Sequence, residues 1–160
     1  MPNVIADTSP IQYLYQTNLL DLLPQIYCSI TIPQAVVNEL AEGLALGISL
    51  PDVTSLSWLK IEVTEVAASL QKISELGSGE KEALTLALSR EDSLVIVDDG
   101  LARNYAKQFD IKVTGTLGIL LKAKQLGYLD SLAPVLNQLE SLGFHLASST
   151  RMNVLQLAEE

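Results

Sequence analysis

The stretch Val4-Ile5-Ala6-Asp7-Thr8-Ser9-Pro10 decides the fold that this chain is expected to adopt. An apolar run ends in one carboxylate, and a turn and a helix start follow at once. The same order recurs at Leu94-Val95-Ile96-Val97-Asp98-Asp99-Gly100. Short runs that are apolar on both faces are typical of strands in a parallel sheet covered by helices. The two stretches therefore predict two buried strands that both end in acids.

Composition limits the class of protein. The chain has 160 residues, 48% of them hydrophobic, so we expect one globular domain over residues 1–160. Its apolar runs are too short to span a membrane, and its start lacks a signal-peptide pattern. A single cysteine, Cys28, excludes an internal disulfide and fits the cytoplasm, where we expect the protein. The net charge of -9 disfavours a simple nucleic-acid-binding module, but bound divalent cations would reverse the local field in a nuclease.

Strands and helices are expected to alternate along the chain. Strands are predicted at 3–6, 26–32, 58–63, 94–97 and 111–114, and the main later helices at 33–46, 65–76, 80–90, 99–109, 116–126, 130–142 and 148–158. This alternation predicts a parallel α/β sheet. In such sheets the functional crevice lies beyond the carboxyl ends of the strands. If the first and fourth strands are neighbours, their terminal acids converge there.

The aspartates at the strand ends have structural as well as functional interpretations. An Asp after a strand is commonly a turn former or a helix cap. Because Thr8 and Ser9 can cap the helix that follows, we expect Asp7 to project into the crevice. Asp98 and Asp99 point to opposite sides if the chain is extended, so one can cap the next helix while the other faces the site. Acids at the ends of two buried strands, in a chain with no other obvious chemistry, suggest a metal site built from carboxylates. We favour Asp99 as a ligand of that site and keep Asp98 as the alternative.

Three glutamates on predicted helices are further candidates. Glu39 lies about 60° around its helix from Val36, at the border of the apolar stripe, where a solvated carboxylate is the ordinary case. Glu80 and Glu82 open a helix, a position where carboxylates interact well with the helix dipole. A helical wheel places Glu80 in the same direction as Leu84 and turns Glu82 away from it. We favour Glu80, because an inward glutamate needs a partner.

Other sites of chemistry are weak in this sequence. Arg103 lies one turn after Asp99, where it could contact phosphate, pair with a site acid or form a plain i,i+4 ion pair. His145 is the only histidine, and neither a nucleotide-binding glycine loop nor a Gly-x-Ser-x-Gly motif is present. Cys28 falls in a predicted strand, so we expect it in the core.

The chain resembles the PIN domain, a family of metal-dependent nucleases that includes the VapC-type toxins of bacterial toxin–antitoxin pairs. The resemblance is closest to a VapC-like subfamily and runs across nearly the whole chain. The segments that carry it are Val4 to Pro10, Ile32-Pro33 with Val37-Asn38-Glu39-Leu40, Gly79-Glu80-Lys81-Glu82-Ala83-Leu84, Val97-Asp98-Asp99-Gly100 with Arg103, and Gly115-Thr116-Leu117-Gly118-Ile119-Leu120.

The resemblance implies a three-layer α/β fold, in which a five-stranded parallel sheet of order 3-2-1-4-5 is flanked by helices. It also implies an acid cluster that holds Mg²⁺ or Mn²⁺. Carried over by position, these acids are Asp7, Glu39, Glu80 or Glu82, and Asp99. Thr8, Thr116 and Arg103 are the matching candidates for substrate contacts. The family's third acid is usually a lone Asp, so the choice between the two glutamates stays open.

The expected function is hydrolysis of RNA phosphodiester bonds by a metal-dependent endoribonuclease, the toxin of a toxin–antitoxin pair. Mg²⁺ and Mn²⁺ take oxygen ligands, and this chemistry needs no histidine base or covalent nucleophile. RNA, an antitoxin protein and a second copy of the chain are the expected partners, with no membrane. The alternative is a catalytically weak PIN-like module that acts through a protein partner. A phosphatase or receiver domain is a third interpretation, which the single acid in Asp7-Thr8-Ser9 disfavours.

Overall fold

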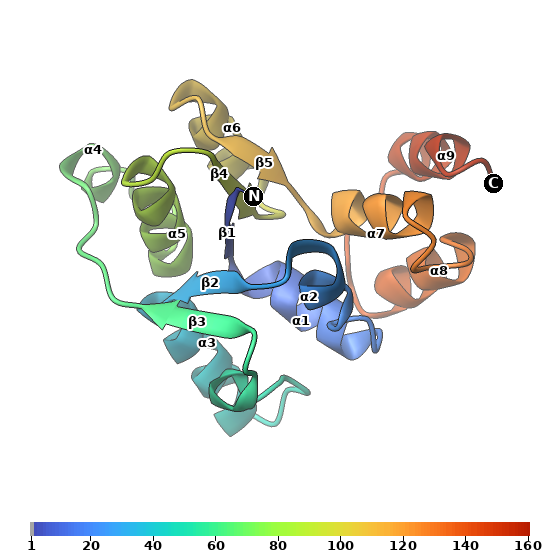
Figure 1. Ribbon diagram of the computed structural model, residues 1–160, viewed down its shortest axis with the longest axis horizontal. Helices are drawn as coiled ribbons and strands as arrows, with labels where there is room; N and C mark the ends of the chain where they lie inside the picture. The colour runs from blue at the N-terminus through green and yellow to red at the C-terminus, as the bar shows by residue number, and fades with distance from the viewer. Residues whose placement is uncertain (1) are drawn as a thin grey trace.

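A parallel sheet forms the centre of the computed structural model, which describes residues 2–160. Within those residues five strands lie in the order β3-β2-β1-β4-β5, as the resemblance implies (Figure 1). The strands are β1 (Asn3–Ala6), β2 (Ile30–Pro33), β3 (Leu59–Glu62), β4 (Ser93–Ile96) and β5 (Lys112–Thr114). In the register, Ile5 of β1 lies opposite Thr31 of β2 on one side and Val95 of β4 on the other. The two strands that end in acids are therefore neighbours.

Helices cover both faces of this sheet. They are α1 (Thr8–Gln16), α2 (Leu22–Tyr27), α3 (Gln34–Ala45), α4 (Ala68–Gln71), α5 (Ser78–Leu88), α6 (Gly100–Gln108), α7 (Thr116–Gln125), α8 (Ala133–Ser141) and α9 (Ser148–Leu157), with a 3-10 turn at Val53–Ser55. Side chains of β1 alternate between two hydrophobic cores, as the period of a strand requires. Val4 and Ala6 join the core formed with α1, α2, α7 and α8, whereas Ile5 joins the core formed with α5 and α6. This gives the three-layer α/β arrangement (Figure 1).

The predicted second strand begins too early in the sequence. Helix α2 continues through Tyr27, and β2 starts only at Ile30. Leu22, Leu23 and Tyr27 are buried on one side of that helix, and their packing outweighs the strand propensity of the segment. Cys28, expected in the core, is instead exposed at the end of α2 with a φ of 68°.

Two predictions around α5 are also wrong. The helix expected at 65–76 is reduced to the single turn of α4, and α5 begins at Ser78 and so includes Gly79. Glycine is required at residue 79 because other side chains pack closely against it, and it does not interrupt the helix. A Cβ there would lie 2.9 Å from Glu39 Oε1 and 3.0 Å from Asp7 Oδ1. Within residues 2–160, none of the helices has the length and apolar character that crossing a membrane requires.

Candidate functional site

Asp7 follows β1 directly and occupies the N-cap position of α1, which begins at Thr8. Its backbone N–H donates to Ile96 O at 3.0 Å, which fixes it beside the end of β4. Its side chain makes no capping hydrogen bond, and the residue is only 7% exposed. Burial raises the pKa of Asp7 to about 7; the Thr8 amide opposes this shift, and the charges of nearby acids add to it. The fold thus holds a buried carboxyl whose charge is poorly compensated.

Glu39 reaches the same place from α3. Its Oε2 accepts a hydrogen bond from the Thr8 hydroxyl, and its Oε1 accepts one from the Gly79 N–H at 3.1 Å. These two bonds join the starts of α1 and α5 to α3. Thr8, predicted as a substrate contact, holds Glu39 in position in this structure.

The two competing glutamates of α5 lie in different places. Glu80 borders the hollow that also contains Asp7, and its buried Oε2 has no hydrogen-bond partner within the part of the chain that the structure describes. Burial, followed by the negative charges of Asp7 and Asp99, raises the pKa of Glu80 to about 7. Glu82 faces a separate hollow, and its Oε1 accepts a hydrogen bond from the Ala35 N–H at 3.1 Å. The fold therefore brings Glu80, and not Glu82, to the other acids.

Asp98 and Asp99 divide their roles as neighbours after β4. Asp99 caps α6, because its Oδ2 accepts from the Ala102 N–H at 2.9 Å. Asp98 accepts from the Ser9 hydroxyl at 3.0 Å and from both the N–H and the hydroxyl of Thr116 at 2.7 Å. Both acids also border the hollow. Thr116 is fully buried, and in this structure it positions Asp98. The substrate contact predicted for Thr116 stays a prediction.

Arg103 lies beside Asp98 at Gly115. A Cβ at residue 115 would be 2.8 Å from Arg103 Nη1 and 2.8 Å from Asp98 Oδ1. Glycine is therefore the residue that allows the guanidinium and the carboxylate to approach the backbone here. The structure places Arg103 near a site acid, but the described residues show no ion pair between Arg103 and Asp98, so its predicted roles stay predictions.

The acids open onto one hollow of about 530 Å³. It is lined by Asp7, Thr8, Ser9, Gln12, Tyr13, Glu39, Glu80, Asp98, Asp99, Phe144 and His145. Five of these side chains were not predicted as site residues from the sequence: Ser9, which was considered only as a helix cap, and Gln12, Tyr13, Phe144 and His145. Gln12 lies one turn after Thr8 on α1, so helical spacing could have indicated it. Nothing in the sequence indicated Phe144 or His145. They lie in the segment that connects α8 and α9, and only the tertiary fold brings that segment to α1.

The family model described as "PIN domain" matches residues 3–160. The chain belongs to the PIN-domain family. PIN domains are generally nucleases that use divalent metals, so the fold is a nuclease fold and the chain is a hydrolase at that coarse level. A comparison with curated proteins finds no match. The acid-lined hollow lies where the strand ends of this PIN domain meet, as expected for the functional crevice of a parallel sheet.

The donor set of the hollow fits a divalent cation in chemistry. Carboxylate oxygens are the ligands that Mg²⁺ and Mn²⁺ prefer, and one oxygen of Glu80 is buried without a partner among residues 2–160. Without a cation, the charges of Glu39, Asp98 and Asp99 add to the rise in the pKa of Asp7, and those of Asp7 and Asp99 add to the rise for Glu80. Among residues 2–160, however, no three Asp, Glu, His or Cys side chains stand in an arrangement that could already hold a metal ion. The carboxylates would have to move closer together to share one.

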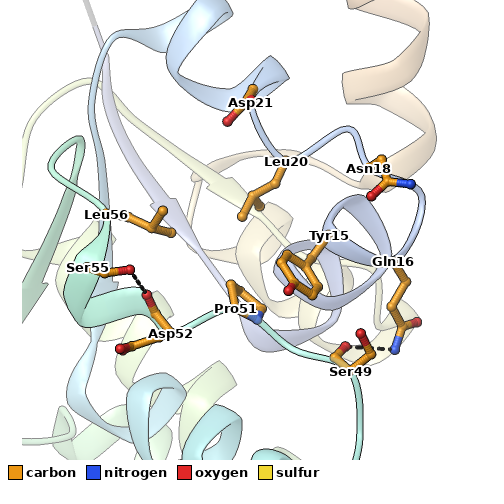
Figure 2. A pocket seen from close by; sticks show the side chains of 10 residues that line it. All are labelled: Tyr15, Gln16, Asn18, Leu20, Asp21, Ser49, Pro51, Asp52, Ser55 and Leu56. Carbon is orange, nitrogen blue, oxygen red and sulfur yellow. Dashed lines mark hydrogen bonds between the residues drawn. The ribbon is translucent and has the colours of Figure 1, made fainter.

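A second hollow of about 510 Å³ lies between the end of α1 and the segment that follows α3 (Figure 2). Its two aspartates, Asp21 and Asp52, lie on opposite sides of the space (Figure 2). Asp52 is occupied by local hydrogen bonds, since its Oδ1 accepts from the N–H and hydroxyl of Thr54. This hollow therefore lacks the convergent acids of the site and supplies matched control positions.

Proposed function

We propose that this PIN domain is an endoribonuclease that hydrolyses single-stranded RNA with Mg²⁺ or Mn²⁺. The observation that carries the proposal is the pair of carboxyls, Asp7 and Glu80, that share one open hollow and both have a pKa raised to about 7. Holding such groups together costs the folded protein stability unless a cation neutralises them. The nuclease character of the family supplies the reaction class.

Hydrogen bonding separates the acids into two kinds. One oxygen of Glu80 has no hydrogen-bond partner among the described residues, and the side chain of Asp7 makes no capping hydrogen bond. These two acids, with Asp99 at the N-terminus of α6, would hold the cation. Glu39 and Asp98 are more fully bonded within the protein and would orient that set. A bound cation supplies an activated water and neutralises charge on the phosphate. In the metal-free protein, a pKa of about 7 lets Asp7 and Glu80 hold a proton near neutral pH, and binding of the cation would displace it.

We also propose that the protein is the toxin of a toxin–antitoxin pair in the cytoplasm, with an antitoxin protein covering the acid hollow and a second copy as a further partner. The segments Gly79 to Leu84 and Gly115 to Leu120, which resemble the VapC-like subfamily, support this role. The alternative is a catalytically weak binding module, which the absence of a ready three-acid arrangement within residues 2–160 favours.

The test is cleavage of a labelled single-stranded RNA with Mn²⁺, with Mg²⁺ and with EDTA. We expect cleavage that EDTA abolishes, and a loss of at least about 100-fold in Asp7→Asn, as is typical when an essential charge-bearing group is removed. Asp21→Asn is the matched control, because Asp21 is exposed and makes no capping bond. Wild-type rates in Asp7→Asn would refute the assignment. Absence of cleavage together with absence of Mn²⁺ binding would favour the binding module.

A further inference from the structure

We propose that four residues lining the same hollow as the acids, Gln12, Tyr13, Phe144 and His145, form a subsite that stacks one unpaired RNA base beside the scissile phosphate. We call these four residues the aromatic wall. The inference rests on the proposed ribonuclease function and adds what holds the substrate there. It also explains why a loop from the end of the chain returns to the acid site.

The rings of the aromatic wall are close together and accessible. Tyr13 of α1 and Phe144 pack edge to face, with ring centroids 5.0 Å apart and an angle of 87° between the ring planes. Both rings are half-buried against the larger hydrophobic core, while His145 is exposed at the rim. Packing against the core explains why Phe144 is partly buried. It does not explain why the polar side chains of His145 and Gln12 line the same hollow.

Backbone hydrogen bonds fix the position of Phe144. Gly143 has a φ of 93°, and its N–H donates to Glu140 O at 3.1 Å. The N–H of Phe144 donates to Leu139 O at 3.0 Å. This pair of bonds is the Schellman motif that closes a helix, here α8, with glycine in the left-handed conformation. The backbone that carries Phe144 is therefore fixed without substrate, which reduces the entropy lost on binding.

Charge indicates what this wall must recognise. The lining of the hollow contains five acids and no lysine or arginine, so its side chains offer no cationic contact for an RNA backbone. Affinity for RNA that remains without a bound cation would then come from the bases. Aromatic faces stack any base, and the ring nitrogens of His145 and the amide of Gln12 can hydrogen-bond a base edge. Only an unpaired base presents its face to such a wall, which selects single-stranded RNA.

The size of the hollow agrees with this occupant. Its volume of about 530 Å³ falls within the range of roughly 300–1,000 Å³ that is usual for small-ligand sites. One nucleotide can thus place its base on the aromatic wall while its phosphate faces Asp7 and Glu80. A duplex cannot bring a base face to the same position without opening a pair.

The test measures RNA binding without requiring cleavage. A fluorescent single-stranded RNA oligonucleotide is titrated with the full-length Asp7→Asn protein in EDTA, and the anisotropy gives Kd. We expect Phe144→Leu, introduced into this protein, to raise Kd about 5- to 100-fold, the range for loss of one base–aromatic stack. Tyr128→Leu is the matched control, since Tyr128 is 49% exposed and lies outside the hollow. Mononucleotides should compete with the oligonucleotide, whereas ribose 5-phosphate should not.

His145→Ala keeps the test decisive if Phe144→Leu fails to fold, because the exposed imidazole contributes little packing. We expect it to raise Kd and, with wild-type Asp7 and Mn²⁺, to raise KM for RNA while kcat stays within about threefold. Equal Kd values for the His145, Phe144 and Tyr128 variants, or competition by ribose 5-phosphate, would overturn the aromatic wall as a base subsite. Base-dependent binding by a wild-type protein that cleaves no RNA would instead refute the proposed function and leave the subsite standing.

Discussion

Two regions of this PIN domain treat carboxylates in opposite ways. At the end of the chain, Glu160 accepts hydrogen bonds from the N–H groups of Leu132 and Ala133 and the hydroxyl of Ser131, at 2.7 to 3.2 Å. The ammonium group of Lys124 lies 3.3 Å from it. These donors, with the Leu132 N–H first among them, lower the pKa of Glu160 to about 2. The protein thus supplies hydrogen-bond donors and a positive charge for this carboxylate, which ties the end of α9 to the start of α8.

The acid hollow is the contrasting region. Burial raises the pKa of Asp7 and of Glu80 to about 7, and one oxygen of Glu80 has no partner among the described residues. Several donors surround Glu160, whereas the backbone N–H of Thr8 for Asp7 and that of Gly77 for Glu80 offset only part of the effect of burial. Perturbed pKa values of this kind cluster at functional sites because the charge is needed for a ligand. The difference indicates that the folded protein is less stable because of the acids in the hollow, and that these acids are there to bind a ligand.

The largest expected effect is on RNA cleavage, and it comes from replacing a glutamate of α5. Glu80→Gln removes the charge of the unpartnered carboxylate, and we expect RNA cleavage to fall by about 100-fold or more. Glu82→Gln is the matched control on the same helix, because a glutamine oxygen can still accept from the Ala35 N–H. We expect its rate to stay within about threefold of wild type. Equal losses in both variants would remove the distinction between the two glutamates.

Stability of the metal-free protein should respond to Asp7→Asn in a pH-dependent way. The pKa of Asp7 rises from 3.8 to about 7 on folding, so the folded state binds more protons between those values and loses stability as the pH rises through them. Asp7→Asn removes this loss. We expect it to increase the free energy of unfolding by about 2–4 kcal/mol at pH 8 and hardly at all at pH 4, since one pKa unit corresponds to about 1.4 kcal/mol.

Urea denaturation in EDTA at several pH values measures this effect, and Asp21→Asn serves as the control. A variant less stable than wild type at pH 8 would mean that the protein stabilises the charged form of Asp7, as it does that of Glu160.

The third effect concerns the close approach at Gly79. A Cβ there would press on the carboxylates of Glu39 and Asp7, so we expect Gly79→Ala to lower cleavage about tenfold. Gly100→Ala is the control, because nothing lies within 4 Å of a Cβ at that residue. Cleavage kinetics and melting temperatures of the two variants separate a shift of the acids from a general loss of fold. Identical rates for the two alanine variants would contradict the packing argument.

The smallest effect belongs to Glu160. The pKa of this acid falls from 4.5 to about 2 on folding, so its contribution to stability is present above pH 4.5 and is lost as the pH falls through 2. We expect Glu160→Gln to lower the melting temperature by a few degrees at pH 7 and to leave RNA cleavage unchanged. Calorimetric melting at pH 7 and pH 2 measures it. A rise in melting temperature at pH 7 would mean that Glu160, like Asp7, destabilises the folded protein, which would contradict the contrast between them.

Much of the site follows from local rules that the sequence obeys. The strand-end rule brought Asp7 together with Asp98 and Asp99, because parallel strands present their carboxyl ends at one edge. A helical wheel was enough to direct Glu80 toward the hollow that the structure describes, because α5 is regular through that residue. The sheet order itself came from the family resemblance and not from the periodicity of the chain.

The rest depends on tertiary packing. The segments at 26–27 and 65–76 were misassigned because burial against the core, and not local propensity, sets their conformation. The role of Asp98 depends on donors from Thr116, which lies after another strand. Phe144 and His145 join the hollow only because α8 turns the chain back toward α1, and no local pattern encodes that return.

The measurement that tests the central claim most directly is calorimetric titration of Mn²⁺ into the metal-free protein at pH 6.5, in two buffers with different ionisation enthalpies. Because metal ligands must be deprotonated and the pKa values of Asp7 and Glu80 are about 7, binding should release protons. We predict saturable binding with a heat that depends on the buffer, and loss of that binding in Asp7→Asn but not in Asp21→Asn. Mn²⁺ binding that is absent, or that is the same in Asp7→Asn as in the wild type, would contradict the account.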